Sequence, residues 1–255
     1  MTQHLENDWL EITTAHGRKL RVLKRVHPRS RRLRLTVTTQ GARVTCPPGT
    51  HPAQVGAFLR AHADWLAAKL DELHLSARPL PALRVGQELE IPLRGERVAL
   101  RWLDGPYPRV VADAVGLTVV LPRPHQRALE LARGLVVGHL ETLIRRDVAR
   151  WLGPYVEALQ RAPSGFRVRP MKSLWGSLDT RDQINLDLAL ALAPPAALRY
   201  VLVHELCHLR VRNHSPRFWQ HVTTLLPDWQ LQRTWLREHG ALLKAELDRL
   251  VGTVR

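Results

Sequence analysis

The chain has 255 residues, of which 45% are hydrophobic, so it can bury a core and fits one large domain or two small ones. Its net charge of +15 favours polyanionic partners such as nucleic acid or nucleotides, although only five of the 38 basic residues are lysine and a codon bias toward arginine would have the same effect. The absence of a long apolar run excludes a membrane-spanning helix, and two cysteines, Cys46 and Cys207, are too few for a disulfide framework. With a start that does not resemble a secretory signal, these features predict a cytoplasmic protein.

The amino-terminal part is predicted to be rich in β-structure and strongly basic. Residues 18–34 are densely basic and lead into a β-hairpin, in which Leu33, Leu35 and Val37 alternate ahead of a turn at Gln40-Gly41. A helix is expected from Pro52 to about Leu75. Four short alternating runs then predict a small antiparallel sheet: 88–93, 97–103, 109–114 and 117–122.

The carboxyl-terminal part begins with a long helical pattern from about residue 125 to 160, which Gly153-Pro154 is expected to break. Residues 167–192 are interpreted as two antiparallel strands around a turn at 179–183. Pro194-Pro195 should start the next helix, because proline suits the first helical turn. We therefore expect an α+β fold with an amino-terminal region, 1–124, and a carboxyl-terminal region, 125–255.

The stretch VLVHELCHLRVRNHS, residues 201–215, contains the pattern HExxH on this apolar helix. His204 and His208 are four residues apart, so their imidazoles project from one helix face and can share an ion. Zinc is the natural candidate, with two histidines, a third protein ligand and a fourth position for water. Glu205 is placed to reach that water without ligating the metal. Asn213 is a plausible end for the helix.

His214 is the candidate third ligand. It immediately precedes Ser215-Pro216, which are expected to be the N-cap and first residue of another helix, so the chain would turn back there toward the first two ligands. Other residues that could complete the site are His221, Asp228 and Glu238. Cys207 is interpreted as a small packing residue, because one helical turn cannot direct His, Glu, Cys and His at one ion.

The run from 167 to 229 resembles the YgjP-like family of zincin metallopeptidases, relatives of the SprT-type proteases. The matching residues are Trp175-Gly176-Ser177, Asn185-Leu186, Pro194, Tyr200-Val201, His204-Glu205-Leu206, His208-Leu209, Asn213-His214-Ser215 and Phe218-Trp219. The basic hairpin and Ala63-Asp64-Trp65-Leu66 are similar to the family's amino-terminal region, more weakly. The chain departs from the family pattern at Leu178, where cysteine is common, and at Cys207, where a small residue such as alanine is usual.

This resemblance implies a zincin-like α+β core with Zn²⁺ on His204, His208 and His214 and with Glu205 as the general base. The predicted protein is a zinc metallopeptidase acting on a peptide or protein, which could pair with the edge of the strand at 174–178. Tyr200 and Arg181 are candidates for oxyanion stabilisation, Trp175 for lining the site, and Asp182, Asn185 and Asp187 for orienting the histidines. Two alternatives remain open: a metal-dependent nucleoside triphosphate hydrolase, and a nucleic-acid-associated protein with a structural zinc. The sequence does not predict the oligomeric state.

Overall fold

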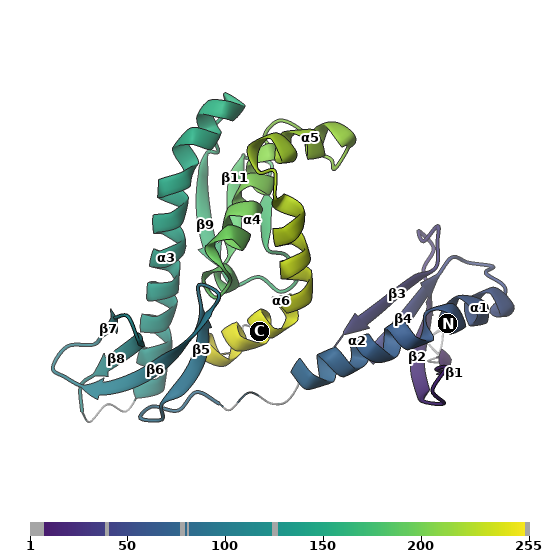
Figure 1. The fold of residues 1–255 in the computed structure, drawn as a ribbon, viewed down its shortest axis with the longest axis horizontal. Helices are drawn as coiled ribbons and strands as arrows, with labels where there is room; N and C mark the ends of the chain where they lie inside the picture. The colour runs from purple at the N-terminus through teal and green to yellow at the C-terminus, as the bar shows by residue number, and fades with distance from the viewer. Residues whose placement is uncertain (1–7, 39–40, 77–79, 81, 124–126, 253–255) are drawn as a thin grey trace, which may run out of the picture. The chain divides into compact units, whose positions relative to one another are not determined.

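The computed structural model describes residues 8–38, 41–76, 80, 82–123 and 127–252. By its contacts the chain divides into two compact units, residues 1–79 and residues 80–255 (Figure 1). The expected boundary at 124/125 assigned the four strands between residues 89 and 121 to the amino-terminal region. The contacts instead group these strands with the carboxyl-terminal elements. No helix in the described part of the chain is long and apolar enough to span a bilayer.

The first unit pairs one mixed sheet with two helices. The strand order is β1-β2-β4-β3, and the expected hairpin is present because β3 pairs antiparallel with β4, although Gln40 of its turn lies outside the described residues. The predicted single helix is wrong, since α1 ends before His62 and α2 starts after it. The elements are β1 Asp8–Thr13, β2 Lys19–Val26, β3 Arg34–Thr38, β4 Gly41–Cys46, α1 Pro52–Ala61 and α2 Ala63–Ser76.

The second unit begins with a sheet of order β5-β6-β8-β7 that packs against the long helix α3. The sheet is mixed and not purely antiparallel as expected, because β6 and β8 run parallel. The elements are β5 Leu89–Leu93, β6 Glu96–Asp104, β7 Arg109–Ala112, β8 Gly116–Leu121 and α3 Ala128–Leu159. Pro154 lies within α3 and does not break it, since the next turn is held in the core by buried Tyr155 and Leu159.

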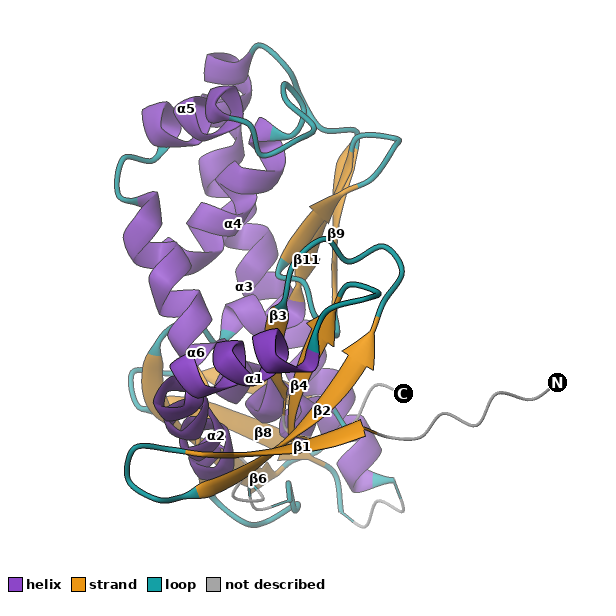
Figure 2. Cartoon of the chain, turned by 90° about the vertical axis from the view of Figure 1, so that its right-hand side faces the viewer, coloured by secondary structure: helices purple, strands orange, loops and turns teal. Residues whose placement is uncertain are grey.

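The remaining elements surround α4, which carries the HExxH pattern. Helix α4 contacts α3, α5, α6 and the strands β10 and β11 (Figure 2). Pro194 is its N-cap residue and Pro195 its first residue, as predicted. These elements are β9 Gly165–Arg169, β10 Gly176–Leu178, β11 Gln183–Asp187, the 3-10 helix η1 Leu188–Ala191, α4 Pro195–Cys207, α5 Pro216–Leu225 and α6 Trp229–Val251.

The small third sheet has the order β10-β11-β9, so β10 is an edge strand. The antiparallel pairing of β10 with β11 confirms the two strands expected around the turn at 179–183. The sequence did not predict the third strand, β9, which pairs parallel to β11. It also extended the second strand too far, because the chain enters η1 at Leu188.

The turn between β5 and β6 holds the start of α4. The backbone N–H groups of Arg94 and Gly95 donate to the carbonyl oxygens of Ala191 and Leu192, each at 3.0 Å. A Cβ on Gly95 would lie 2.7 Å from Cγ of Pro194, the N-cap residue of α4, so a side chain does not fit there. The second sheet therefore positions the helix that carries His204 and His208.

Candidate metal centre

Three histidines converge from two neighbouring backbone segments. His204 lies within the last turn of α4, His208 is its C-cap residue, and His214 comes just before the N-cap residue of α5, Ser215. The expectation that the helix would continue to Asn213 is wrong, because α4 ends at Cys207. The backbone then turns, with the N–H groups of both Arg210 and Val211 donating to the carbonyl of Cys207 at 3.0 Å. This turn brings His214 back toward the helix.

The separations of the ring nitrogens fit a metal ion. The Nε2 atoms of His204 and His214 are 3.0 Å apart, and one nitrogen from each of the three histidines lies within 4.8 Å of the others. Two nitrogens bound to one tetrahedral zinc are separated by about 3.3 Å, so small side-chain rotations would bring all three into ligand positions. Within the described residues, this is the one cluster of three or more potential metal ligands.

The environment keeps two of these imidazoles neutral, as metal ligation requires. The pKa of His204 is lowered to about 3, mainly by burial, with smaller contributions from His208, His214 and Arg233. Burial also lowers the pKa of His208. Nδ1 of His208 lies 3.0 Å from the carbonyl oxygen of Val211, and a proton on Nδ1 in that hydrogen bond leaves the Nε2 lone pair free for a metal.

Glu205 follows His204 on α4 and lies against the edge strand β10. Its side chain is buried, and burial raises its pKa to about 8, while a hydrogen bond with the backbone of Leu178 opposes this rise. A Cβ on Gly176 would lie 2.8 Å from Oε1 of Glu205, so only glycine lets the strand pass this close to the carboxylate. The carboxylate is therefore fixed between the helix and the strand.

The alternative third ligands lie outside this cluster. Glu238 is exposed and pairs with Arg237, Asp228 is the N-cap residue of α6, and His221 lies within α5. The geometry therefore brings together His204, His208 and His214 and leaves out the other three.

The residues expected to orient the histidines have other partners. Asp182 pairs with Arg161 and Arg212, and the Asn185 amide lies 3.4 Å from Oγ of Ser177. Asp187 is fully buried, where it accepts from the N–H of Ala189, caps η1 and pairs with Lys244. In the hydrogen bonds of the described residues none of the three reaches a histidine ring, and for His208 that role falls to the carbonyl of Val211.

Cys207 lies on α4 between the two histidines of the motif but is not part of the histidine cluster. The Cys207 thiol is fully buried, and burial raises its pKa to about 12, which agrees with a packing residue and not with a ligand.

Of the two candidates for oxyanion stabilisation, Tyr200 is close to the histidines, with its ring centroid 5.9 Å from that of His204. Arg181 is exposed in the turn between β10 and β11.

Two aromatic residues that match the family pattern, but to which the sequence assigned no role, cover the histidines. The Phe218 ring lies 4.5 to 4.9 Å from all three histidine rings, and the Trp219 ring lies 5.7 Å from that of His214. Both residues belong to α5, and Trp219 stacks on Trp229 at 4.4 Å. The amphipathic pattern of α5 predicts that such residues are buried, but it does not indicate what they cover.

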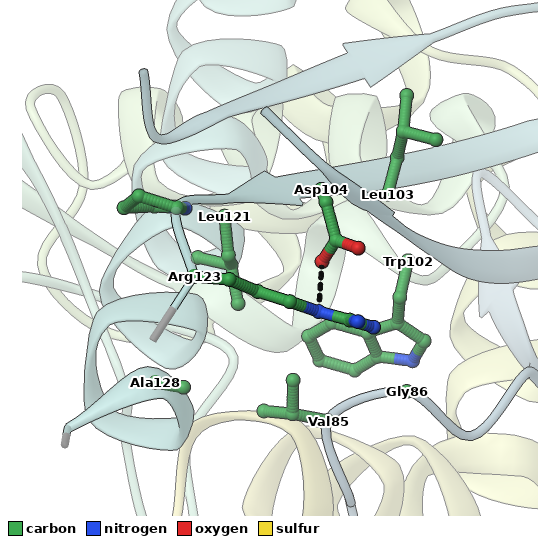
Figure 3. A pocket seen from close by; sticks show the side chains of 9 residues that line it. Val85, Gly86, Trp102, Leu103, Asp104, Leu121, Arg123 and Ala128 are labelled. Atoms are coloured by element: carbon green, nitrogen blue, oxygen red, sulfur yellow. Dashed lines mark ion pairs between the residues drawn. The ribbon is translucent and has the colours of Figure 1, made fainter. Parts of the chain in front are cut away.

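A different cavity, of ≈ 330 Å³, lies beside the second sheet (Figure 3). Trp102 forms part of its wall, and Arg123 Nε pairs with Asp104 Oδ1 at 2.6 Å across it. None of its nine lining residues is a histidine or belongs to α4, α5 or α6, so it is separate from the metal centre.

Comparison with known proteins identifies the family to which the chain belongs. The family model described as "YgjP-like, metallopeptidase domain" matches residues 31–239. No protein with a curated description matches the chain significantly. The chain is thus a metal-dependent hydrolase of the metallopeptidase class. Within that class it belongs to the YgjP-like family, as the motifs between residues 167 and 229 indicated.

Proposed function

We propose that the protein is a zinc-dependent metallopeptidase in which His204, His208 and His214 hold the ion and Glu205 is the general base. The observation that carries this proposal is the convergence of three imidazoles at the end of α4, the helix that also carries the buried carboxylate of Glu205. Imidazole nitrogens suit zinc, whereas Mg²⁺ prefers oxygen ligands, so the donor set favours peptide hydrolysis over nucleoside triphosphate hydrolysis. Three protein ligands also leave a coordination position open, unlike the four-ligand structural sites.

When bound, zinc would polarise the scissile carbonyl, and its charge would lower the pKa of both the attacking water and the Glu205 carboxyl. Glu205 accepts the proton of that water and then transfers it to the leaving amine. The close approach of Gly176 and the hydrogen bond from Leu178 hold the carboxylate in one position during both transfers.

The edge strand β10 offers a backbone for substrate binding. It pairs with β11 on one side, and its other side is the edge of the sheet. An extended peptide could add to this edge through main-chain hydrogen bonds, which recognise any sequence. Because Gly176 and Leu178 of β10 contact Glu205, a peptide in that position would lie close to the proposed base.

The substitution Glu205→Gln tests the proposal. Glutamine keeps the shape of the side chain but cannot accept the proton, so zinc content should be unchanged while peptide hydrolysis falls by about 10²–10⁴-fold. Zinc would be measured by elemental analysis, and activity on the substrate found by a screen of casein, peptide libraries and nucleotides. Glu238→Gln, which changes an exposed glutamate of α6, is the matched control. Near-normal hydrolysis by the zinc-loaded Glu205→Gln protein would refute the proposed role.

A further inference from the structure

A cavity of ≈ 470 Å³ opens beside the metal centre. Helix α6 contributes most of its lining, Tyr200 contributes from α4, and Trp175 contributes from the segment just before the edge strand β10. The lining residues are Trp175, Tyr200, Trp229, Gln230, Arg233, Thr234, Leu236 and Arg237. The volume is in the range of small ligand-binding cavities, so a side chain of a substrate can enter it.

Ring contacts connect this cavity to the histidines. Tyr200 lies one helical turn before His204, and their ring centroids are 5.9 Å apart. The Trp229 ring stacks on Tyr200 at 6.3 Å and on Trp219 at 4.4 Å, and Trp219 in turn stacks on His214 at 5.7 Å. The cavity therefore begins one layer of side chains away from the proposed ligands.

The wall formed by Trp175 is fixed in place. A Cβ on Gly240 of α6 would lie 2.7 Å from Cζ2 of Trp175, so the indole packs directly on the helix backbone. Lys244 Nζ lies 4.5 Å from the centre of the same ring and donates to the carbonyl oxygens of Met171 and Leu174. Because Trp175 directly precedes β10, a peptide on the edge of that strand would pass the mouth of the cavity.

The charge of the cavity is positive and unbalanced. Its lining includes two arginines and no acidic residue. The guanidinium carbon of Arg233 lies over the Trp219 ring, 5.2 Å from its centre, and over the Trp229 ring at 5.8 Å; in the described residues no carboxylate lies within 4.0 Å of this guanidinium. Arg237 faces Glu238 at 3.8 Å, where both side chains are exposed. A guanidinium that contacts the faces of aromatic rings can still direct N–H donors at a planar anion.

We propose that this cavity is a subsite for a carboxylate-bearing substrate residue next to the scissile bond, and that Arg233 determines the preference. The proposal rests on the peptidase function proposed above. The carboxylate can belong to an aspartate or glutamate side chain or to the carboxyl terminus of the peptide, because Arg233 would bind either through the same paired hydrogen bonds. The indole and phenol rings would cover the methylene groups.

The test measures binding, so it does not depend on turnover. Zinc-loaded Glu205→Gln protein is titrated calorimetrically with three N-acetylated hexapeptides of one background sequence. Two have an amidated carboxyl terminus, one with an internal glutamate and one with glutamine at that position; the third is the glutamine peptide with a free carboxyl terminus. At least one carboxylate peptide should bind about tenfold more tightly than the fully capped glutamine peptide, as expected for a charge-assisted contact. Comparison of the two carboxylate peptides tells which source the cavity accepts.

Two further substitutions, each added to Glu205→Gln, test whether Arg233 causes the preference for carboxylate peptides. Arg233→Gln should bring all three peptides to equal affinity, whereas Arg150→Gln, the same charge change on α3, should keep the preference. Equal binding of all peptides, no binding of any of them, or a preference that survives Arg233→Gln would overturn the subsite. Failure of the peptidase itself has a different signature: the wild-type protein would cleave no peptide, even if the carboxylate preference in binding is present.

Discussion

Each of the three histidines reaches the centre by a different backbone feature. His204 stands in the last turn of a buried helix, His208 caps the end of that helix, and His214 follows a tight turn. The spacing of the first two within the motif predicts their common face, because residues four apart lie above one another on a helix. The place of His214 depends on where the helix ends, which the sequence pattern put six residues too late, at Asn213 and not at Cys207.

Replacing any one of His204, His208 and His214 with alanine should lower bound zinc well below a stoichiometric amount. A site with two imidazoles lacks a ligand that the tetrahedral ion needs. Elemental analysis of protein purified without added metal measures the effect. His221→Ala, on α5 outside the cluster, serves as the control and should retain the metal. Full zinc occupancy in His214→Ala would contradict the ligand assignment.

The sequence did not identify Arg233 as a candidate functional residue. The HExxH pattern is local, so its helix, its histidines and Glu205 are visible in fifteen consecutive residues. Arg233 belongs to a later helix, and its guanidinium lies over the rings of Trp219 and Trp229, which stack on each other. Nothing in the sequence distinguishes it from the other arginines of a chain rich in this residue.

At the scale of elements, the turn between β5 and β6 is the support for α4. Arg94 has a positive φ of 54°, donates its N–H to Ala191 and pairs through its side chain with buried Asp147 of α3 at 2.7 Å. Gly95 follows with a φ of 86° and contacts Pro194. One turn thus fixes η1, α3 and the first residues of α4 relative to one another.

Gly95→Ala should therefore destabilise the second unit. Alanine is strained at this φ, and its Cβ would collide with the N-cap residue of α4, so we expect the free energy of unfolding to fall by about 2 kcal/mol or more. Thermal and denaturant unfolding measure this change. Gly138→Ala, on an exposed position of α3 where a Cβ meets no atom within 4 Å, should be neutral or slightly stabilising. Equal stability of the two variants would rule out this role for the turn.

Local patterns predicted most elements and failed where tertiary packing decides. Proline and serine signals correctly placed the starts of α4 and α5. Pro154 was expected to end α3, but burial of Tyr155 and Leu159 after it compensates for the missing hydrogen bond. Alternation identified the strands of the second sheet but not their order, because the parallel pairing of β6 with β8 joins strands that are not consecutive in sequence.

At the scale of the whole molecule, the excess of basic residues is the feature that the peptidase proposal does not use. The net charge of the chain is +15, and the segment from 27 to 34 in the first unit contributes four arginines. The family model spans parts of both units, since it matches residues 31–239. A nucleic-acid partner for this charge and a cytoplasmic location both stay predictions.

If Arg29, Arg31, Arg32 and Arg34 contact phosphates, DNA or RNA binding should weaken steeply with salt. Changing all four to glutamine should flatten the dependence of log K on log salt concentration by about 0.9 for each phosphate of duplex DNA that the variant no longer neutralises. Fluorescence anisotropy with labelled oligonucleotides at several salt concentrations gives the slope. The same slope in both proteins would leave the codon bias as the explanation for the charge.

The end of α4 at Cys207 gives a bound ion a mechanical role as well. Two of the proposed ligands belong to the helix and its cap, whereas the third lies at the start of the segment that leads into α5, so the ion would act as a cross-link between neighbouring elements. Such a link would close the loop from 209 to 213 and hold Phe218 and Trp219 over the centre. Apo and metal-loaded protein would then differ mainly in how rigidly α5 is held, and amide exchange in α5 would slow on metal loading while exchange in α3 stays the same.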